Sequence, residues 1–117
     1  MTPGTYNFKP QKRGDTFSGF MFEVTQNSIP VDFTDAVITI QLRVKPGSKV
    51  ILEWKTSDGS ITISGAGNNV INMNVKTGPE MNVAPNTYKY DINVVLASGV
   101  TNTYVAGVFP IVDDITR

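Results

Sequence analysis

The chain has 117 residues, ten basic against ten acidic side chains for a formal net charge of zero, and neither histidine nor cysteine. This composition excludes disulfides, thiolate metal sites and histidine-based catalysis, and neutrality argues against nucleic acid or an anionic membrane as the partner. A chain of this length forms one domain that buries roughly two-thirds of its unfolded surface. We therefore predict a protein that is not an enzyme and has no cofactor, metal or small-molecule substrate.

The first twelve residues show no clean strand period, and we interpret 1–12 as an extended arm before a single domain at 13–117. The arm and its boundary carry two aromatic side chains two positions apart and a small basic cluster: Tyr6, Phe8, Lys9, Lys12 and Arg13. The chain begins without the charged start and apolar stretch of a signal peptide, so we expect synthesis in a host cytoplasm. Its apolar runs are too short to span a bilayer.

Alternation of apolar and polar residues predicts short strands through the rest of the chain. The stretch 15–24 is apolar on both faces, which is typical of a central strand. The stretch 36–44 points four aliphatic side chains inward: Ile38, Ile40, Leu42 and Val44. Val50, Leu52 and Trp54 form the inward face of the next strand, and Asp58-Gly59 is a tight-turn signal that joins it to a strand over 60–64 as a hairpin.

A glycine-rich turn at 65–69 leads into a strand over 70–76, and 77–84 is the one stretch suited to a helical turn, capped by Thr77. The clearest period-two stripe follows: Tyr88, Tyr90, Ile92, Val94 and Leu96. In the last strand, 100–112, the expected inward residues are Tyr104, Ala106 and Val108. Seven or eight short strands with regular turns predict an all-β fold, an antiparallel Ig-like β-sandwich.

Acidic residues occur in two close pairs, Asp32 with Asp35 and Asp113 with Asp114. Two carboxyls about 5–10 Å apart in a cleft can hydrolyse glycosides, so a small hydrolase stays open as an alternative. We favour the interpretation that these side chains cap turns through hydrogen bonds to nearby backbone. The tripeptide Arg13-Gly14-Asp15 is one that integrins recognise, but we interpret it as a turn with solvated charges.

Four stretches carry a resemblance to a known family: RGDTF (13–17), IPVDFTDAV (29–37), PNTYKYDI (85–92) and GVFPIVDDITR (107–117). In order and spacing they resemble small Ig-like β-sandwich domains of tailed-phage virion proteins, such as the N-terminal domain of the baseplate upper protein of lactococcal phages. The resemblance covers 14–117 and implies a scaffolding role without catalysis. It also implies a structural corner in which the Tyr88 hydroxyl bonds to backbone upstream.

The leading hypothesis is a structural protein of a tailed-phage virion or prophage, located in the tail or baseplate, the neck or the capsid surface. Its arm would add to a sheet edge of a neighbouring subunit, where pockets for Tyr6 and Phe8 set the register. The expected partners are other virion proteins, and a homo-oligomer is an open option. The alternative is a ligand-binding module for a host receptor or carbohydrate. Sugar binding usually needs exposed aromatic side chains, and most aromatic residues of this chain alternate in step with the inward-facing residues of their strands.

Overall fold

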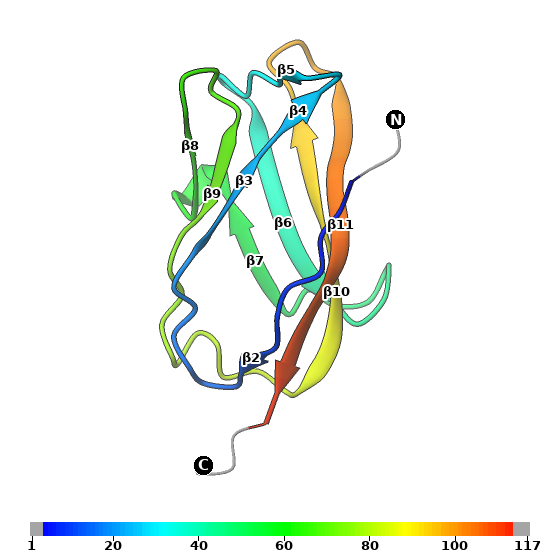
Figure 1. The fold of residues 1–117 in the computed structure, drawn as a ribbon. Helices are drawn as coiled ribbons and strands as arrows, with labels where there is room; N and C mark the ends of the chain where they lie inside the picture. Colours follow the sequence, from blue (N-terminus) through cyan, green and yellow to red (C-terminus); the bar gives the residue numbers. More distant parts are fainter. Residues whose placement is uncertain (1–3, 114–117) are drawn as a thin grey trace.

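Two sheets pack face to face in the computed structural model, which describes residues 4–113 (Figure 1). The first sheet has the order β1-β11-β10-β6-β7, with β2 also paired to β11, and the second has the order β3-β9-β8. A small hairpin, β4-β5, stands apart from both. The strands are β1 (Gly4–Thr5), β2 (Gln11–Lys12), β3 (Phe20–Glu23), β4 (Thr25–Gln26), β5 (Ile29–Pro30), β6 (Val37–Arg43), β7 (Leu52–Lys55), β8 (Ile61–Ser64), β9 (Val70–Met73), β10 (Asn86–Val95) and β11 (Thr101–Val112).

This strand order is that of an immunoglobulin-type sandwich. The neighbours β11, β10 and β6 correspond to strands G, F and C of one sheet, and β3, β9 and β8 correspond to B, E and D of the other. In the described part of the chain, seven strands have four or more residues, and the other four have two each. The predicted all-β, antiparallel sandwich is confirmed.

The core forms where the alternating stripes of the two sheets meet. On β6 the side chains of Ile38, Ile40 and Leu42 are fully buried, and the stripe of β10 lies beside them. Each buried aliphatic side chain contributes about 1.5–3 kcal/mol of transfer free energy. The predicted inward faces of these two strands are confirmed, except that Val44 lies beyond the end of β6 and is 44% exposed.

The prediction of a central strand at 15–24 is wrong, because β3 is an edge strand paired only with β9. Phe22 faces the core, whereas Met21 faces solvent and is 67% exposed. Gly19 has a φ of 100°, which interrupts the strand period before β3. For this reason Phe17, which has the same parity as Met21, is buried, in an isolated bridge to Lys76.

The turn at Asp58-Gly59 is present, but it does not close a hairpin. It belongs to a 3-10 turn, η1 (Thr56–Asp58), which ends at Gly59 with a φ of 82°. The strands on either side, β7 and β8, belong to different sheets. The local turn signal was therefore correct, whereas the pairing expected from it was wrong.

A bulge reverses the parity of the last strand. The register between β10 and β11 shifts between Ile92 and Asn93, and Tyr104 is the extra residue on β11. Beyond the bulge the opposite set of side chains reaches the core. The buried residues are Phe109 and Ile111, whereas the sequence predicted Ala106 and Val108.

The connection between β9 and β10 contains the predicted cap at Thr77 and the predicted corner at Tyr88. Thr77 and Glu80 form a reciprocal cap, in which the Thr77 N–H donates to Glu80 Oε1 at 2.9 Å and the Glu80 N–H donates to Thr77 Oγ1 at 3.4 Å. Met81, in the same turn, is fully buried. The Tyr88 hydroxyl donates to the carbonyl of Ala84, so the tyrosine corner is confirmed.

Candidate functional site

Residues 4–12 lie along the β11 strand of their own chain (Figure 1). Both β1 and β2 pair with β11 in parallel, and between them the Tyr6 N–H donates to the Ala106 carbonyl at 3.1 Å and the Phe8 N–H to the Val108 carbonyl at 2.9 Å. In the single chain, residues 4–12 therefore bind their own β11, and docking on a neighbouring subunit stays a prediction. The edge of β11 offers main-chain partners within the same chain, and the segment uses them.

The two predicted aromatic anchors do occupy pockets, but these pockets belong to their own sandwich. Phe8 is 7% exposed, and its ring centroid lies 4.6 Å from that of Phe109 and 5.1 Å from that of Tyr90. Tyr6 is half-buried, with its ring 4.9 Å from that of Phe20. Both rings bridge the two sheets, so the segment is part of the core.

The residues of the predicted basic cluster differ in their surroundings. Lys9 and Lys12 are exposed on the arm, whereas Arg13 Nε donates to Asn82 Oδ1 at 2.9 Å. Gly14 has a φ of 79°, and its N–H donates to the Met81 carbonyl at 3.1 Å. The Arg13-Gly14-Asp15 tripeptide is thus a turn that packs on the turn following β9.

A glycine in β11 allows the arm to approach closely. A Cβ at Gly107 would lie 1.9 Å from the Tyr6 carbonyl oxygen, and the Tyr90 hydroxyl donates to that same oxygen at 2.6 Å. The Val108 N–H also donates to Asn7 Oδ1, at 3.2 Å. We call the arm-binding surface of β11, with Gly107 and the Tyr90 hydroxyl, the arm slot.

Burial strongly raises the pKa of Tyr90, so its hydroxyl keeps the proton that it donates to the arm. Sequence reasoning missed the slot because it depends on contacts between residues about a hundred positions apart. One signal was present: a glycine in the middle of a strand often marks a close approach of another backbone.

The outer face of the first sheet contains an open groove of about 790 Å³, between β6, β10, β11 and the turn at 45–47. Its polar lining side chains include Gln41, Arg43, Lys45, Lys89, Asp91 and Asn93. Ala106 and Gly107 also line the groove, and because their side chains are small, the sheet surface is recessed at these positions. We call this depression the outer groove.

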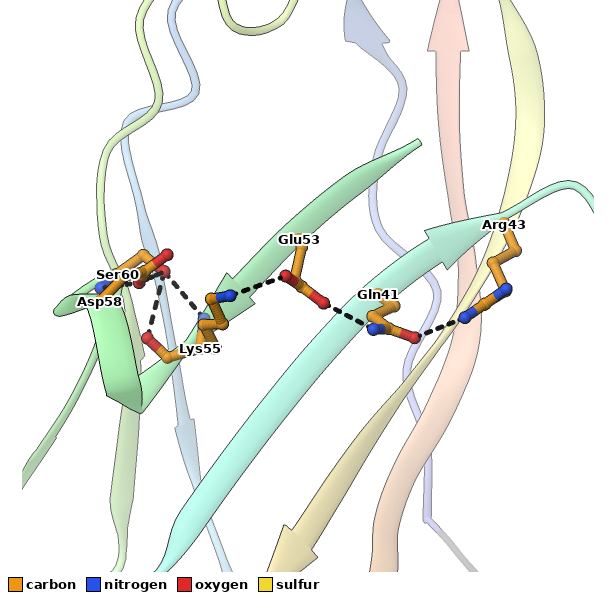
Figure 2. Close-up of polar contacts among 6 residues, drawn as sticks. All are labelled: Gln41, Arg43, Glu53, Lys55, Asp58 and Ser60. Atoms are coloured by element: carbon orange, nitrogen blue, oxygen red, sulfur yellow. Dashed lines mark hydrogen bonds and ion pairs between the residues drawn. The ribbon is translucent and has the colours of Figure 1, made fainter. Parts of the chain in front are cut away.

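A chain of side-chain contacts crosses β6 and β7 beside this groove (Figure 2). Arg43 Nη2 donates to Gln41 Oε1 at 2.9 Å, and Gln41 Nε2 donates to Glu53 Oε2 at 2.5 Å. Glu53 then pairs with Lys55 at 3.3 Å. The hydrogen bond from Gln41, together with Lys55, lowers the pKa of Glu53, and Arg43 also donates to the Ser48 carbonyl.

Two cations occupy paired positions of neighbouring strands in the groove. Arg43 of β6 is the cross-strand partner of Lys89 of β10, and Lys45 lines the same end. Like charges directly opposite one another are destabilising. Asp91, two residues along β10, also lines the groove but forms no ion pair with Lys89 within 4 Å. This end of the groove is suited to an acidic group from outside.

Three carboxylates outside the groove, those of Asp32, Asp58 and Glu80, bind their own turns. Asp32 accepts from the Thr34 N–H at 2.9 Å, and Asp58 accepts from the Ser60 N–H at 2.9 Å. These bonds and the matching hydroxyl contacts lower the pKa of both groups, as the Thr77 bonds do for Glu80. The predicted capping role of Asp32 is confirmed, whereas Asp114 of the second pair lies outside the described residues.

Within residues 4–113, no three acidic side chains are arranged to hold a metal ion. No helix in that range is long and apolar enough to cross a membrane. No protein-family model matches the sequence, and a search of curated proteins gives no significant match.

Proposed function

We propose that this domain is a structural, non-catalytic assembly module of a tailed-phage virion or prophage. It would serve in the tail or baseplate, the neck or the capsid surface, where it binds another virion protein through the outer groove. The observation that carries the proposal is the groove itself, whose rim side chains Arg43 and Gln41 are fixed by the contact chain to Glu53 and Lys55. The resemblance to small sandwich domains of phage particles is a second support.

The contact chain favours protein binding through its effect on entropy. Association normally costs about 0.5–1.5 kcal/mol for each long side chain that becomes immobilised at an interface. Arg43 and Gln41 are already held by hydrogen bonds to each other, to Glu53 and to the Ser48 carbonyl. Much of this cost is therefore met before a partner arrives.

The chemistry of the partner follows from the charges in the groove. An acidic side chain placed between Arg43 and Lys89 would relieve the repulsion of the cross-strand pair and gain two charge-assisted hydrogen bonds. Complementary charges of this kind mainly set specificity and association rate. We therefore expect a partner surface with an exposed Asp or Glu.

The test uses particles of the phage or induced prophage that encodes the chain. Lys89→Glu reverses one groove charge at an exposed residue that has no partner among the hydrogen bonds and ion pairs of the described chain. Lys49→Glu makes the same charge change at an exposed residue outside the groove lining and is the matched control. Mass spectrometry of purified particles then measures incorporation of each tagged chain.

We expect wild type and the Lys49→Glu control to be incorporated equally, and Lys89→Glu to be incorporated at least about tenfold less, as for a loss of about 1.4 kcal/mol. Purified particles without the chain would overturn the virion role. Equal incorporation of Lys89→Glu would overturn the groove as the contact surface while leaving the role itself intact.

A ligand-binding role is the second candidate, because the amide and carboxylate groups of Gln41, Asn93 and Asp91 line the same groove and suit a hydroxyl-rich ligand. A glycan array, run with and without calcium, tests it directly. Specific binding that is lost on Asn93→Ala would favour this candidate over assembly, and an array without binding would remove it.

A further inference from the structure

The contacts between the arm and β11 are those of a strand added to a sheet edge. Main-chain groups provide the hydrogen bonds of Tyr6 and Phe8 to β11, and the Tyr90 hydroxyl binds a main-chain carbonyl. The Phe8 ring provides the side-chain anchor. Strand addition between separate chains uses this same combination of backbone bonds and alternate side-chain pockets.

The main ladders of the sandwich do not depend on the arm, although release of the arm removes Phe8 from the core. β11 is paired with β10 over ten residue positions on its other edge, and this pairing does not involve the arm. The second sheet, β3-β9-β8, also keeps its own ladder. Release of the arm therefore exposes Phe8, the Tyr90 hydroxyl and one edge of β11, while the remaining pairs persist.

The segment between β2 and β3 is suited to act as a hinge. It comprises seven residues, 13–19, with no strand of its own except the bridge at Phe17. Gly14 and Gly19 have φ values of 79° and 100°, a region that glycine enters and leaves without steric penalty. Phe17 is held in the core by its bridge to Lys76, so the free part of the hinge is the four residues 13–16, which span about 13–14 Å when fully extended.

We infer that the arm slot accepts residues 4–12 of a second copy of this chain, so that two molecules exchange arms in a symmetric pair. The exchanged form reproduces every contact of the slot and differs from the closed form only at the hinge, which is the condition for strand swapping. Its population rises with protein concentration, because the closed form is the intramolecular competitor. Arm exchange adds a second copy of the chain to the partners of the proposed assembly module. Its biological use rests on that proposed function.

The register of β1 on β11 allows a direct test. Thr5 is the parallel partner of Ala106, and adjacent strands place Cα atoms about 4.8 Å apart, within the range that a disulfide bridges. The chain has no native cysteine, so engineered thiols have no competitors. Full-length Thr5→Cys and Ala106→Cys chains with different tags are mixed, unfolded and refolded together at several concentrations, and oxidised in a glutathione buffer.

A disulfide between these two chains forms preferentially when the arm of one lies on β11 of the other. The control replaces Ala106→Cys by Thr62→Cys, an exposed position on β8 in the other sheet. The double variant Thr5→Cys/Ala106→Cys at low concentration verifies the register within one chain. Non-reducing electrophoresis and mass spectrometry measure the heterodimer.

We expect the heterodimer to exceed the control by at least about tenfold at the highest concentration and to fall to the control level when the Thr5→Cys chain also carries Phe8→Ala. A heterodimer no more abundant than the control at every concentration would overturn the exchange. So would a double variant that forms no internal disulfide. Because the purified chain alone is used, these outcomes are independent of particle incorporation.

Discussion

Gly107→Ala is the sharpest test of the arm slot. The added Cβ would lie 1.9 Å from the Tyr6 carbonyl oxygen, whereas real contacts of this kind are essentially never shorter than 3.0 Å. The neighbour is backbone, so no flexible side chain can move aside, and Tyr6 must retreat by about 1 Å. We predict that this displacement breaks the pairing of the arm around Tyr6.

The magnitude follows from the contacts that the displacement removes. The bond from the Tyr6 N–H to Ala106 contributes about 1 kcal/mol, and leaving the buried Tyr90 hydroxyl without its acceptor costs about 1–3 kcal/mol. Replacing glycine with alanine also lowers the conformational entropy of the unfolded chain, which stabilises the folded state by about 0.4–1 kcal/mol and offsets part of this loss. The free energy of unfolding should fall by about 1–3.5 kcal/mol, a range mostly below the 3–5 kcal/mol expected when a buried Phe such as Phe8 is truncated.

Urea unfolding followed by the fluorescence of Trp54 measures this change, since Trp54 is the one tryptophan of the chain and is fully buried. Gly4→Ala is the matched control, because its Cβ would lie 3.5 Å from the Tyr104 carbonyl oxygen, an ordinary contact. In a chain without residues 1–12, Gly107→Ala has no arm to displace and should change stability by less than about 0.5 kcal/mol. An undiminished stability in the full chain, or an equal loss in the truncated chain, would refute the reasoning.

Three further predictions concern single side chains. Tyr88→Phe removes the bond to the Ala84 carbonyl and should lower the unfolding free energy by about 1–2 kcal/mol in urea, and an unchanged midpoint would show that the corner is not stabilising. Burial raises the pKa of Tyr90 above its usual 10.0, so the unfolded chain loses this proton first as pH rises. The stability of the folded chain should therefore decline above about pH 10. Tyr90→Phe should be less stable at neutral pH, but its stability should decline less steeply in alkaline thermal melts. Lys89→Glu replaces the repulsion from Arg43 by attraction and should raise the free energy of unfolding by about 0.2–1 kcal/mol at low salt. This gain should shrink in high salt. A loss of stability would contradict the cross-strand geometry.

The parts of the fold that sequence reasoning predicted are those set by local pattern. The stripes of β6 and β10 alternate without interruption, and their inward residues follow from the period alone. The capping pair Thr77 and Glu80 and the corner tyrosine Tyr88 depend on spacings of three or four residues, which a single sequence displays. The cap at Thr77 was predicted at its actual position and the corner at Tyr88 was implied by the resemblance, whereas the part that Glu80 takes in the cap was not predicted.

The errors occurred where distant segments decide the outcome. A tight turn such as Asp58-Gly59 reverses the chain equally well within a sheet or between sheets, and only the packing partners of β7 and β8 distinguish the two. The bulge at Tyr104 similarly depends on the register with β10. In the arm, Tyr6 and Phe8 lie two positions apart, as on one face of a strand, but this spacing does not indicate that β11 of the same chain is the edge that accepts them.

The arm slot and the outer groove share part of their structure, which connects assembly between copies to binding of another protein. Ala106 and Gly107 line the groove, and the same two residues receive the arm at Thr5 and Tyr6. An arm from a second copy would therefore place that copy beside the groove of the first. Displacing the arm should in turn alter the groove floor, since β11 then loses its outer neighbour at these positions. On this reasoning Gly107→Ala should reduce incorporation into particles as Lys89→Glu does, whereas Gly4→Ala should not. If the arm of the Gly107→Ala chain is displaced but the chain is incorporated normally, the arm slot and the outer groove act separately.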